Sequence, residues 1–187
     1  HSFFFKPSTG FRDPIFAKSM VIHDEKGGKL ILVSVDLIGV SKKLTKDVTR
    51  KMKPYGYKRE HIIISATHTH SGPGTLSKNL GLSIIAADLF KKKNYINLRD
   101  KLIASIINAH KNLEPVELYH SQFDAVKIQH NKWRKTRRQY FNPTAKFILA
   151  KSLASKQWLG GMLNFAIHGN GMHIADTRFS GDIPGSI

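Results

Sequence analysis

Cysteine is absent from this chain of 187 residues, and its absence excludes whole classes of protein. Disulfide-linked scaffolds, thiolate zinc fingers, iron–sulfur sites and cysteine nucleophiles all require it. Any metal ion must therefore be held by histidine, by a carboxylate or by another oxygen ligand. No apolar run approaches the roughly 20 residues that a membrane-spanning helix needs, so we expect no membrane span.

Acidic residues are scarce relative to basic ones. There are 30 lysine and arginine residues against 13 aspartate and glutamate residues, which gives a formal charge of +17. Such a charge attracts polyanions, either nucleic acid or an anionic lipid surface. The basic residues are dispersed, lysine dominates, and neither an aromatic-interleaved RNA-binding signature nor a zinc finger is present. These features disfavour nucleic acid as a partner, although a basic nucleic-acid-binding module stays an alternative function.

Hydrophobic residues make up 41% of the chain and charged residues 23%, as in an ordinary folded domain. The chain opens at His1 without an initiator methionine, a basic segment or the apolar segment of a signal peptide. We therefore expect a mature or trimmed product.

The beginning of the chain predicts a β-hairpin. Residues 15–23 and 29–36 are rich in apolar residues of strand character and flank an acidic turn that contains two glycines. The second run is apolar on both faces, so we expect an interior strand that is covered above and below.

A helix and another strand are predicted next. Apolar residues recur at helical spacing after Ser41, which is a suitable cap, and Pro54 ends the pattern. Residues 61–66, with three isoleucines in a row, predict another buried strand. The order strand, helix, strand predicts an α/β fold, with a mixed β-sheet core and flanking helices.

The second half is rich in predicted strands after one long helix. Residues 98–113 carry an apolar stripe of helical period, and Pro115 ends it. Strand patterns follow over residues 116–119, 125–129, 146–150 and 158–167. No internal repeat or low-complexity linker divides the chain, so we predict a single domain over residues 1–187.

Two histidines directly follow a predicted strand, in residues 67–74 (Thr-His-Thr-His-Ser-Gly-Pro-Gly). Ligand sites form at strand ends in α/β sheets because a rigid strand fixes the first residue of the loop. In an extended chain His68 and His70 point to the same side. One imidazole could then bind a metal ion while the other transfers a proton nearby. The spacing alone leaves open a pair of hydrogen-bonded loop histidines.

A second predicted strand ends in the same way, because the apolar run 163–167 leads into His168. We expect the two strands to share one sheet, so that their ends bring His68 and His168 to one ion. Two neutral imidazoles do not complete a tetrahedral zinc site, so at least one further ligand is needed.

Several segments together resemble a known family. They are residues 65–74, residues 165–168 and residues 180–185, with further similarity over residues 10–17 and 33–37. In these segments the chain is similar to the N-terminal catalytic domain of the neutral/alkaline, non-lysosomal ceramidases. The resemblance covers nearly the whole chain, and the string Thr-His-Thr-His-Ser-Gly-Pro is its most specific element.

The resemblance implies a zinc-dependent amide hydrolase that converts ceramide (N-acylsphingosine) to sphingosine and a fatty acid. Carried over by position, His68 and His168 would be zinc ligands, and His70 would act beside the metal on the amide or its leaving group. The substrate would be a lipid amide, and we expect an apolar slot beside the metal. A family homologue that acts on another amide or ester, or that is inactive, is an alternative.

The resemblance also suggests where the protein acts. The family suggests export, to a periplasmic, secreted or membrane-peripheral location. The basic charge could then hold the enzyme on an anionic membrane, at about 1 kcal/mol for each lysine or arginine near the surface.

The chain departs from the family pattern in several ways. In the family a carboxylate and a tyrosine complete the zinc shell and a serine-containing catalytic motif follows, and none of these has a counterpart by residue 187. We therefore expect an incomplete catalytic domain that could be inactive as a fragment. Ser180 is interpreted as a hydrogen-bonding turn residue rather than a nucleophile. Many family members place an Asn-Arg pair near the substrate, and here Asn131 and Lys132 align with it, which predicts substrate binding without arginine's bidentate fork.

Other polar residues have two interpretations each. Asp36 could orient a ligand histidine or cap a loop, and the cap is favoured because the alternative needs a specific geometry. His173 and Asp176 could approach the metal loop, although such residues in glycine-rich turns usually face solvent. The remaining histidines are interpreted as structural or surface residues: His23, His61, His110, His120 and His130.

Overall fold

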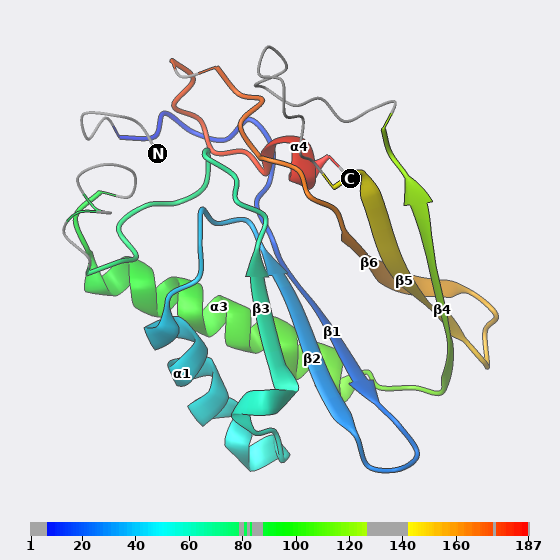
Figure 1. The fold of residues 1–187 in the computed structure, drawn as a ribbon. Helices are drawn as coiled ribbons and strands as arrows, with labels where there is room; N and C mark the ends of the chain where they lie inside the picture. The colour runs from blue at the N-terminus through cyan, green and yellow to red at the C-terminus, as the bar shows by residue number, and fades with distance from the viewer. Residues whose placement is uncertain are drawn as a thin grey trace. The chain divides into compact units, whose positions relative to one another are not determined.

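The structure is a computed structural model of the chain, and it describes residues 7–78, 81, 83, 88–126, 142–173 and 175–186. The chain divides into two compact units. The first combines His1–Leu113 with His168–Ile187, and the second is Glu114–Ile167. Each unit contains its own three-stranded sheet (Figure 1). The single catalytic domain expected from the sequence stays a prediction, because one catalytic domain can contain two compact units.

The first unit begins with the predicted hairpin. β1 (Ala17–His23) and β2 (Lys29–Val35) pair antiparallel along their whole length. Asp24 fixes the turn, because its Oδ1 accepts hydrogen bonds from the backbone N–H groups of Lys26 and Gly28, at 2.9 and 2.7 Å. An aspartate that bonds to the backbone just after it is typical of tight turns, and it reverses the chain here.

A helix and a parallel strand follow, as predicted. α1 (Lys42–Met52) begins after Ser41, whose Oγ accepts the N–H of Leu44 at 3.2 Å. This cap satisfies one of the free N–H groups of the first turn. Two short 3-10 turns separate α1 from the next strand: Lys53–Tyr55 and Arg59–His61. β3 (Ile62–Ala66) then pairs parallel with β2, so the strand, helix, strand unit is confirmed in a mixed sheet of order β1-β2-β3.

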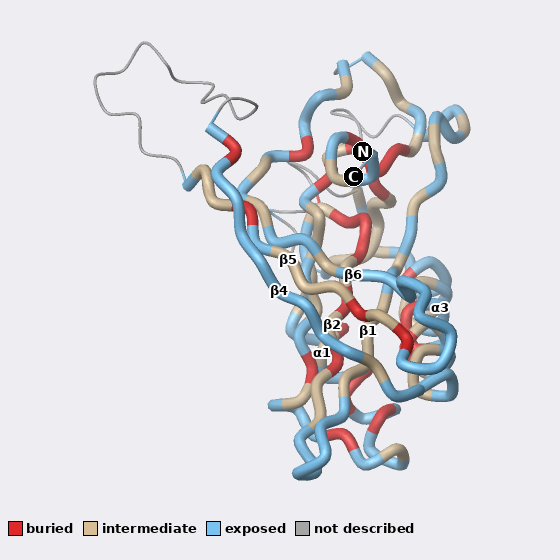
Figure 2. Tube along the Cα trace, turned by 90° about the vertical axis from the view of Figure 1, so that its right-hand side faces the viewer, coloured by how far each residue is buried: buried red, intermediate tan, exposed pale blue. Residues whose placement is uncertain are grey.

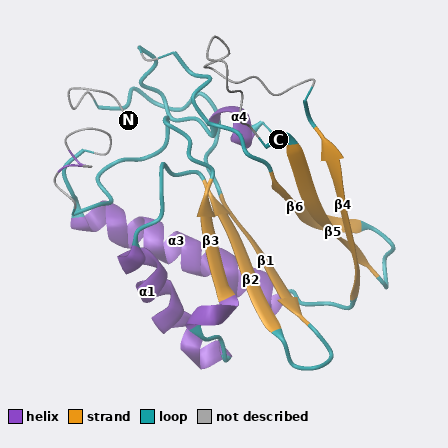
Figure 3. Cartoon of the chain, in the orientation of Figure 1, coloured by secondary structure: helices purple, strands orange, loops and turns teal. Residues whose placement is uncertain are grey.

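The helices of the first unit cover one face of this sheet (Figures 1 and 3). α3 (Lys92–Lys111) contains most of the predicted stripe 98–113, begins before it and ends before Leu113, and it contacts both α1 and β1. The buried core is formed by Ile31, Val33, Leu44, Val48, Met52, Tyr57, Ile62, Tyr95, Leu102, Ile103 and Ile106. β2 is the central strand, as predicted, but among the described residues helices cover it on one face only. On the opposite face Ile63 is 51% exposed, because α1 and α3 both pack against the other side.

The second unit is an antiparallel sheet of order β4-β5-β6, and its described residues contain no helix (Figure 3). Its strands are β4 (Val116–Asp124), β5 (Thr144–Ser152) and β6 (Trp158–Asn164). Figure 2 shows β4 and most of β6 as exposed. The helices and the mixed sheet of the first unit, together with the antiparallel sheet of the second, make the molecule a mixed α/β protein, as predicted.

The bounds of three predicted strands differ from the structure, because β4 extends beyond the predicted 116–119, no strand begins at residue 125, and β6 ends before residue 167. After β4 the N–H of Val126 bonds to Asp124 Oδ1 at 3.0 Å, a side-chain turn that ends the strand. Ala125 and Val126 therefore lie outside any strand, and the rest of the predicted strand 125–129 lies outside the described residues. β6 stops at Asn164 instead of continuing to residue 167.

The expectation that one sheet delivers both metal-site histidines is wrong. β3, which precedes His68, lies in the sheet of the first unit, whereas β6, which precedes His168, lies in the sheet of the second. Which strands pair depends on the packing of residues that are far apart in the chain. A local sequence pattern carries no information about that packing. His168 begins the return of the chain to the first unit.

The last segment of the chain is anchored within the first unit. Phe11 and Phe179 form an isolated parallel bridge, and their ring centroids are 5.3 Å apart. α4 (Asp182–Gly185) is a single short turn that follows. No helix in the described part of the chain is long and apolar enough to cross a membrane.

Candidate metal centre

His68 lies just beyond the end of β3. The preceding residue, Thr67, is held by two hydrogen bonds. Its Oγ1 donates to Asp36 Oδ1 at 3.1 Å, and its N–H donates to the carbonyl of Val35 at 3.0 Å. His68 has a φ of 61°, so the chain has left the extended conformation that the sequence argument assumed. The imidazole Nδ1 lies 2.7 Å from the carbonyl oxygen of Ile38. Because a carbonyl only accepts, Nδ1 carries the hydrogen and Nε2 keeps its lone pair for a metal ion.

Asp36 caps a loop, which is the favoured of its two interpretations. Asp36 is only 6% exposed. Its carboxylate accepts hydrogen bonds from the N–H of Phe16 at 2.7 Å and from Thr67 Oγ1 at 3.1 Å. Both partners are loop residues rather than imidazoles. The orientation of His68 is instead set by a backbone carbonyl, which no sequence pattern reveals.

His70 is held through its backbone. Its N–H donates to the carbonyl of Gly169 at 3.0 Å, and the neighbouring Thr69 is fully buried. The half-buried imidazole has a pKa below its ordinary value, mainly because of burial and also because His168 and His68 lie close to it. The ring is therefore biased toward the neutral form, which can accept a metal ion or a proton.

The loop that carries His168 approaches the His68 loop closely at Gly169. A Cβ at this glycine would lie 3.1 Å from Thr69 Cα and 3.2 Å from the carbonyl oxygen of His68. Both neighbours are backbone atoms, which cannot turn aside as a flexible side chain can. A glycine directly after His168 therefore lets the two loops touch.

The three histidines named from the sequence form one cluster. The ring centroids of His68 and His70 are 5.1 Å apart, those of His68 and His168 are 4.8 Å apart, and those of His70 and His168 are 4.9 Å apart. The Nε2 atoms of His70 and His168 lie at a hydrogen-bonding distance of 2.8 Å. One ligand nitrogen from each ring lies within 4.8 Å of the other two. The structure thus brings all three together, although the strands before them lie in different sheets.

This donor set fits a transition metal ion. Zinc binds imidazole nitrogen at about 2.0–2.1 Å in tetrahedral sites, so nitrogens around one ion are about 3.3 Å apart. The Nε2 atoms of His70 and His168, at 2.8 Å, are already close to that separation. Imidazole also suits copper, iron and nickel, so the cluster could bind any of several ions.

Three other predicted residues of the segment after His168 have partners outside the imidazole cluster. The Ser180 hydroxyl donates to Asp13 Oδ2 at 2.6 Å, as expected for a hydrogen-bonding turn residue. Asp176 pairs with Arg178 at 2.6 Å, and this contact holds the pKa of the Asp176 carboxyl far below its usual range. His173 Nδ1 accepts a hydrogen bond from the backbone two residues later, at 3.2 Å.

Two of the histidines interpreted as structural flank a buried tyrosine. Tyr57 is 1% exposed, and its Oη lies 2.8 Å from His23 Nε2 and 2.8 Å from His110 Nδ1. These contacts join the end of β1 to the end of α3, so both histidines are part of the fold.

The predicted substrate-binding residues Asn131 and Lys132 lie outside the described residues, as does His130. The sequence interpretation missed two supporting groups, the carbonyl of Ile38, which bonds to His68, and the carboxylate of Asp13, which bonds to Ser180. Asp13 lies in the segment 10–17 that resembles the family, and that resemblance could have pointed to it.

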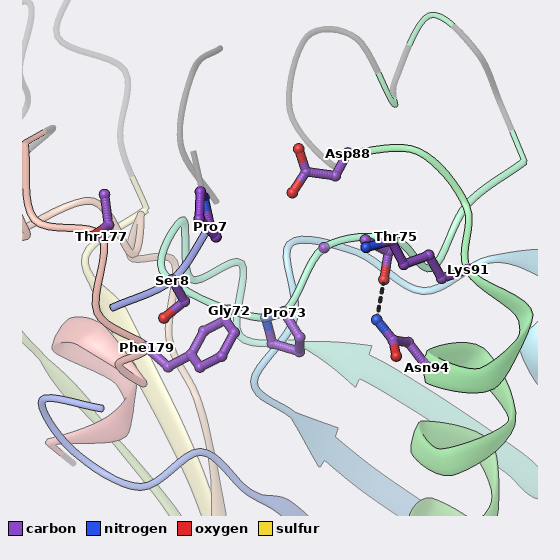
Figure 4. Close-up of a pocket in the computed structure, with 11 residues that line it drawn as sticks. Pro7, Ser8, Gly72, Pro73, Thr75, Asp88, Lys91, Asn94, Thr177 and Phe179 are labelled. Carbon is purple, nitrogen blue, oxygen red and sulfur yellow. Dashed lines mark hydrogen bonds between the residues drawn. The ribbon is translucent and has the colours of Figure 1, made fainter. Parts of the chain in front are cut away.

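A pocket of about 200 Å³ is lined by the loop that follows His70 (Figure 4). Its lining residues are Pro7, Ser8, Gly72, Pro73, Gly74, Thr75, Asp88, Lys91, Asn94, Thr177 and Phe179. Asn94 Nδ2 donates to Thr75 Oγ1 on one wall at 2.8 Å. The lining includes both charged and apolar residues, and the apolar slot expected beside the metal stays a prediction.

The sequence matches the family model of the neutral/alkaline non-lysosomal ceramidase, N-terminal, over residues 4–186. The chain belongs to the neutral/alkaline non-lysosomal ceramidase family. Membership confirms the resemblance that was drawn from the histidine motifs.

Curated ceramidases show how much of a family member the chain represents. The neutral ceramidase of Oryza sativa subsp. japonica is 24% identical over 192 residues, which cover 96% of this chain and 24% of that protein. Neutral ceramidase A of Dictyostelium discoideum is 29% identical over 110 residues, which cover 57% of this chain and 15% of that protein. The chain thus spans about a quarter or less of the length of these relatives.

Solved ceramidases share the fold. A ceramidase complexed with C2 superposes with a TM-score of 0.86, and the neutral ceramidase from Pseudomonas aeruginosa with a TM-score of 0.83. Both are 22% identical to this chain and cover 98% of it, and the chain covers 30% and 31% of theirs.

Proposed function

We propose that this chain supplies the histidine part of a zinc-dependent amide hydrolase site that converts N-acylsphingosine to sphingosine and a fatty acid. The observation that carries the proposal is the cluster of His68, His70 and His168, whose ligand atoms lie within 4.8 Å of one another. Membership in the ceramidase family supports the choice of reaction and of substrate class.

His68 and His168 are the proposed zinc-holding residues. The bond between His68 Nδ1 and the Ile38 carbonyl, at 2.7 Å, supports this role because it fixes the ring and leaves Nε2 as a donor. The ring of His168 lies 4.8 Å from that of His68, centroid to centroid. When bound, zinc supplies a Lewis acid for the amide carbonyl and makes water a nucleophile at neutral pH.

His70 is the proposed proton carrier. Its Nε2 lies 2.8 Å from His168 Nε2, so the ring is next to the proposed ion-binding position. A neutral imidazole there can accept a proton from the water that attacks the amide carbonyl. It can then donate this proton to the departing amine of the sphingoid base. Without this proton the amine would be a poor leaving group.

Ceramide hydrolysis by the protein tests the proposal. Chelation should abolish the activity and added zinc should restore it, and His68→Gln should lower it by at least about 100-fold because a metal ligand is lost. His120→Gln is the matched control, because His120 is an exposed histidine of β4, and it should keep wild-type activity.

The same assay separates the alternatives. Hydrolysis of short N-acyl amines or esters, with ceramide left intact, would assign a different substrate to the same site. Ceramide hydrolysis that survives both chelation and the His68→Gln change would contradict the proposed zinc chemistry.

Peripheral binding to an anionic membrane, from an exported location, completes the proposal. The formal charge of +17 supports it, since each lysine or arginine near an anionic surface contributes about 1 kcal/mol. Co-sedimentation should be stronger with phosphatidylserine vesicles than with phosphatidylcholine vesicles, and added salt should weaken it. Equal binding to both kinds of vesicle would refute the membrane part, and cell fractions with the protein in the cytoplasm would refute export.

A further inference from the structure

Ser180 is a buried residue that bonds directly to the His68–His70 loop and, through Asp182, is linked to the His168 loop. It is 1% exposed. Its Oγ donates to Asp13 Oδ2 at 2.6 Å and accepts the N–H of Asp182 at 2.9 Å. Its carbonyl accepts the Thr69 hydroxyl at 2.8 Å, and its N–H donates to the carbonyl of Ser71 at 3.0 Å. Each of its polar atoms is therefore committed to a specific partner.

On one side Ser180 fixes the loop that carries His68 and His70. Thr69 lies between these two histidines and is fully buried, and its Oγ1 also accepts the N–H of Ser71 at 3.1 Å. This loop has no strand partner, and His68 adopts a left-handed φ of 61°. Its conformation therefore depends on individual hydrogen bonds, these among them, rather than on a sheet ladder.

On the other side Ser180 fixes Asp182, which holds the loop after His168. Asp182 has a left-handed φ of 58°, and its carboxylate accepts the N–H groups of Gly171 at 3.0 Å and Met172 at 3.4 Å. The approach is close, because a Cβ at Gly171 would lie 2.9 Å from Asp182 Oδ1. The position of Asp182 thus determines the path of the chain just beyond His168.

Asp13 anchors this arrangement from the beginning of the chain. Its Oδ2 accepts the Ser180 hydroxyl, and its Oδ1 accepts the N–H of Gly181 at 2.7 Å. A carboxylate that accepts two short hydrogen bonds from adjacent residues restricts both their backbone and the serine rotamer. Ser180 is therefore held rigidly enough to locate its other partners.

We infer that Ser180 is a positioning residue that sets the spacing between the His68–His70 loop and the His168 loop, and so prepares the cluster for a metal ion. The inference rests on the proposed zinc site. Ser180 acts through Thr69 and Asp182, not by contact with an imidazole. Metal ligands must be held to within about 0.5 Å of their productive positions, and residues that orient them typically change metal affinity by 10–100-fold when replaced.

Ser180→Ala and Ser152→Ala form a matched pair for the test. Ser152 is also 1% exposed, and its Oγ likewise donates to a carboxylate, Glu114 Oε2 at 3.0 Å, and accepts a backbone N–H, that of Ser155 at 3.1 Å. Ser152 belongs to β5 of the second unit. Both variants lose the same kind of buried hydroxyl, so a general loss of stability should affect both.

The first measurement is zinc affinity by competition with a chromophoric chelator, accompanied by thermal unfolding of each variant. Ser180→Ala should bind zinc at least about 10-fold more weakly than wild type, whereas Ser152→Ala should bind it normally despite a comparable drop in melting temperature. Equal zinc affinity in the two variants would overturn the inference.

The second measurement needs no metal. In protein labelled with ¹⁵N-histidine, Ser180→Ala should shift the imidazole resonances of His70 and His168, and Ser152→Ala should not. Thr69→Val, which removes the hydroxyl that bonds to the Ser180 carbonyl and to the N–H of Ser71, should act in the same direction and provides a second variant if Ser180→Ala fails to fold.

The two measurements distinguish the inference from the proposed function. Wild-type protein without zinc affinity would refute the proposed zinc site, while the imidazole shifts would still decide whether Ser180 positions the loops. Unchanged resonances of His70 and His168 in both Ser180→Ala and Thr69→Val would refute the positioning role.

Discussion

Replacing Tyr95 with phenylalanine removes a buried hydrogen bond between the two main helices. Tyr95 of α3 is 4% exposed, and its Oη donates to Asp47 Oδ2 of α1 at 2.7 Å. A hydrogen bond to a charged group contributes about 1.5–3 kcal/mol. In the variant the Asp47 carboxylate keeps its ion pairs with Lys43 at 2.7 Å and Arg50 at 3.2 Å, so it still has hydrogen-bond partners after the tyrosine bond is lost. We therefore expect the free energy of unfolding to fall by about 2 kcal/mol.

Thermal unfolding followed by circular dichroism measures this loss. For a chain of this size 1 kcal/mol corresponds to about 2–4 °C, so Tyr95→Phe should lower the melting temperature by about 4–8 °C. Tyr119→Phe is the matched control, because Tyr119 donates to Glu117 Oε2 over the same distance of 2.7 Å but is 44% exposed. It should leave the melting temperature unchanged, since exposed pairs contribute little. Equal shifts in the two variants would refute the argument from burial.

The pH dependence of unfolding tests the same contact independently. The pKa of Asp47 is held below its ordinary value, first by the hydrogen bond from Lys43 and next by that from Tyr95. The unfolded state therefore binds the proton more readily, and the contribution to stability is complete above an unfolded pKa of about 3.9. It is lost as the pH falls through the depressed folded value. Urea unfolding at decreasing pH should show a shallower loss in Tyr95→Phe than in wild type, and identical slopes would contradict this.

Three other changes test separate parts of the structure. Gly169→Ala should weaken zinc affinity by roughly tenfold, because the added Cβ would meet Thr69 Cα at 3.1 Å and displace the His168 loop; wild-type affinity would show that the loops need no glycine. Ser41→Ala should lower the free energy of urea unfolding by about 1 kcal/mol through loss of the N-cap, and an unchanged midpoint would refute the cap. Partial desolvation, together with the nearby Lys29 and His110, lowers the pKa of His23. The contribution of neutral His23 to stability should therefore be complete above about pH 6.5 and decrease below it toward the depressed folded value. His23→Gln should remove part of that decrease, and an unaltered pH profile would count against it.

Local patterns were sufficient to predict the three strands of the first unit, α1 and most of α3, but not the start of α3 or α4. The strands β1 and β2 flank a turn in which the Asp24 carboxylate accepts the N–H of Gly28. The helix α1 begins just after Ser41, whose hydroxyl caps its first turn. In each case the residues that determine the element are only a few positions apart. Strand patterns also identified parts of β4, β5 and β6, although not all of their ends.

Long-range pairing could not be predicted in the same way. The strands before His68 and His168 have similar apolar patterns, but they belong to different sheets. The sequence argument selected histidines that the structure brings together, because a polar residue that directly follows an apolar run tends to lie near a strand end. Their convergence depends instead on the return of the chain to the first unit and on the close approach at Gly169.

The supports of the cluster were also beyond the reach of local patterns. Ser180 bonds to Asp13 and Thr69, which are 167 and 111 residues away in the chain. The carbonyl of Ile38 that fixes the His68 ring belongs to the backbone, so no residue type marks it. Contacts of this kind are consequences of tertiary structure.

Zinc content of the purified protein is the most direct test of the shared metal ion. Wild type should carry roughly one zinc ion per chain, and both His68→Ala and His168→Ala should lose it, because each removes a proposed ligand. His120→Ala, which changes an exposed histidine of β4, should retain the zinc. Wild-type protein without zinc, or full zinc content in both ligand variants, would contradict the account.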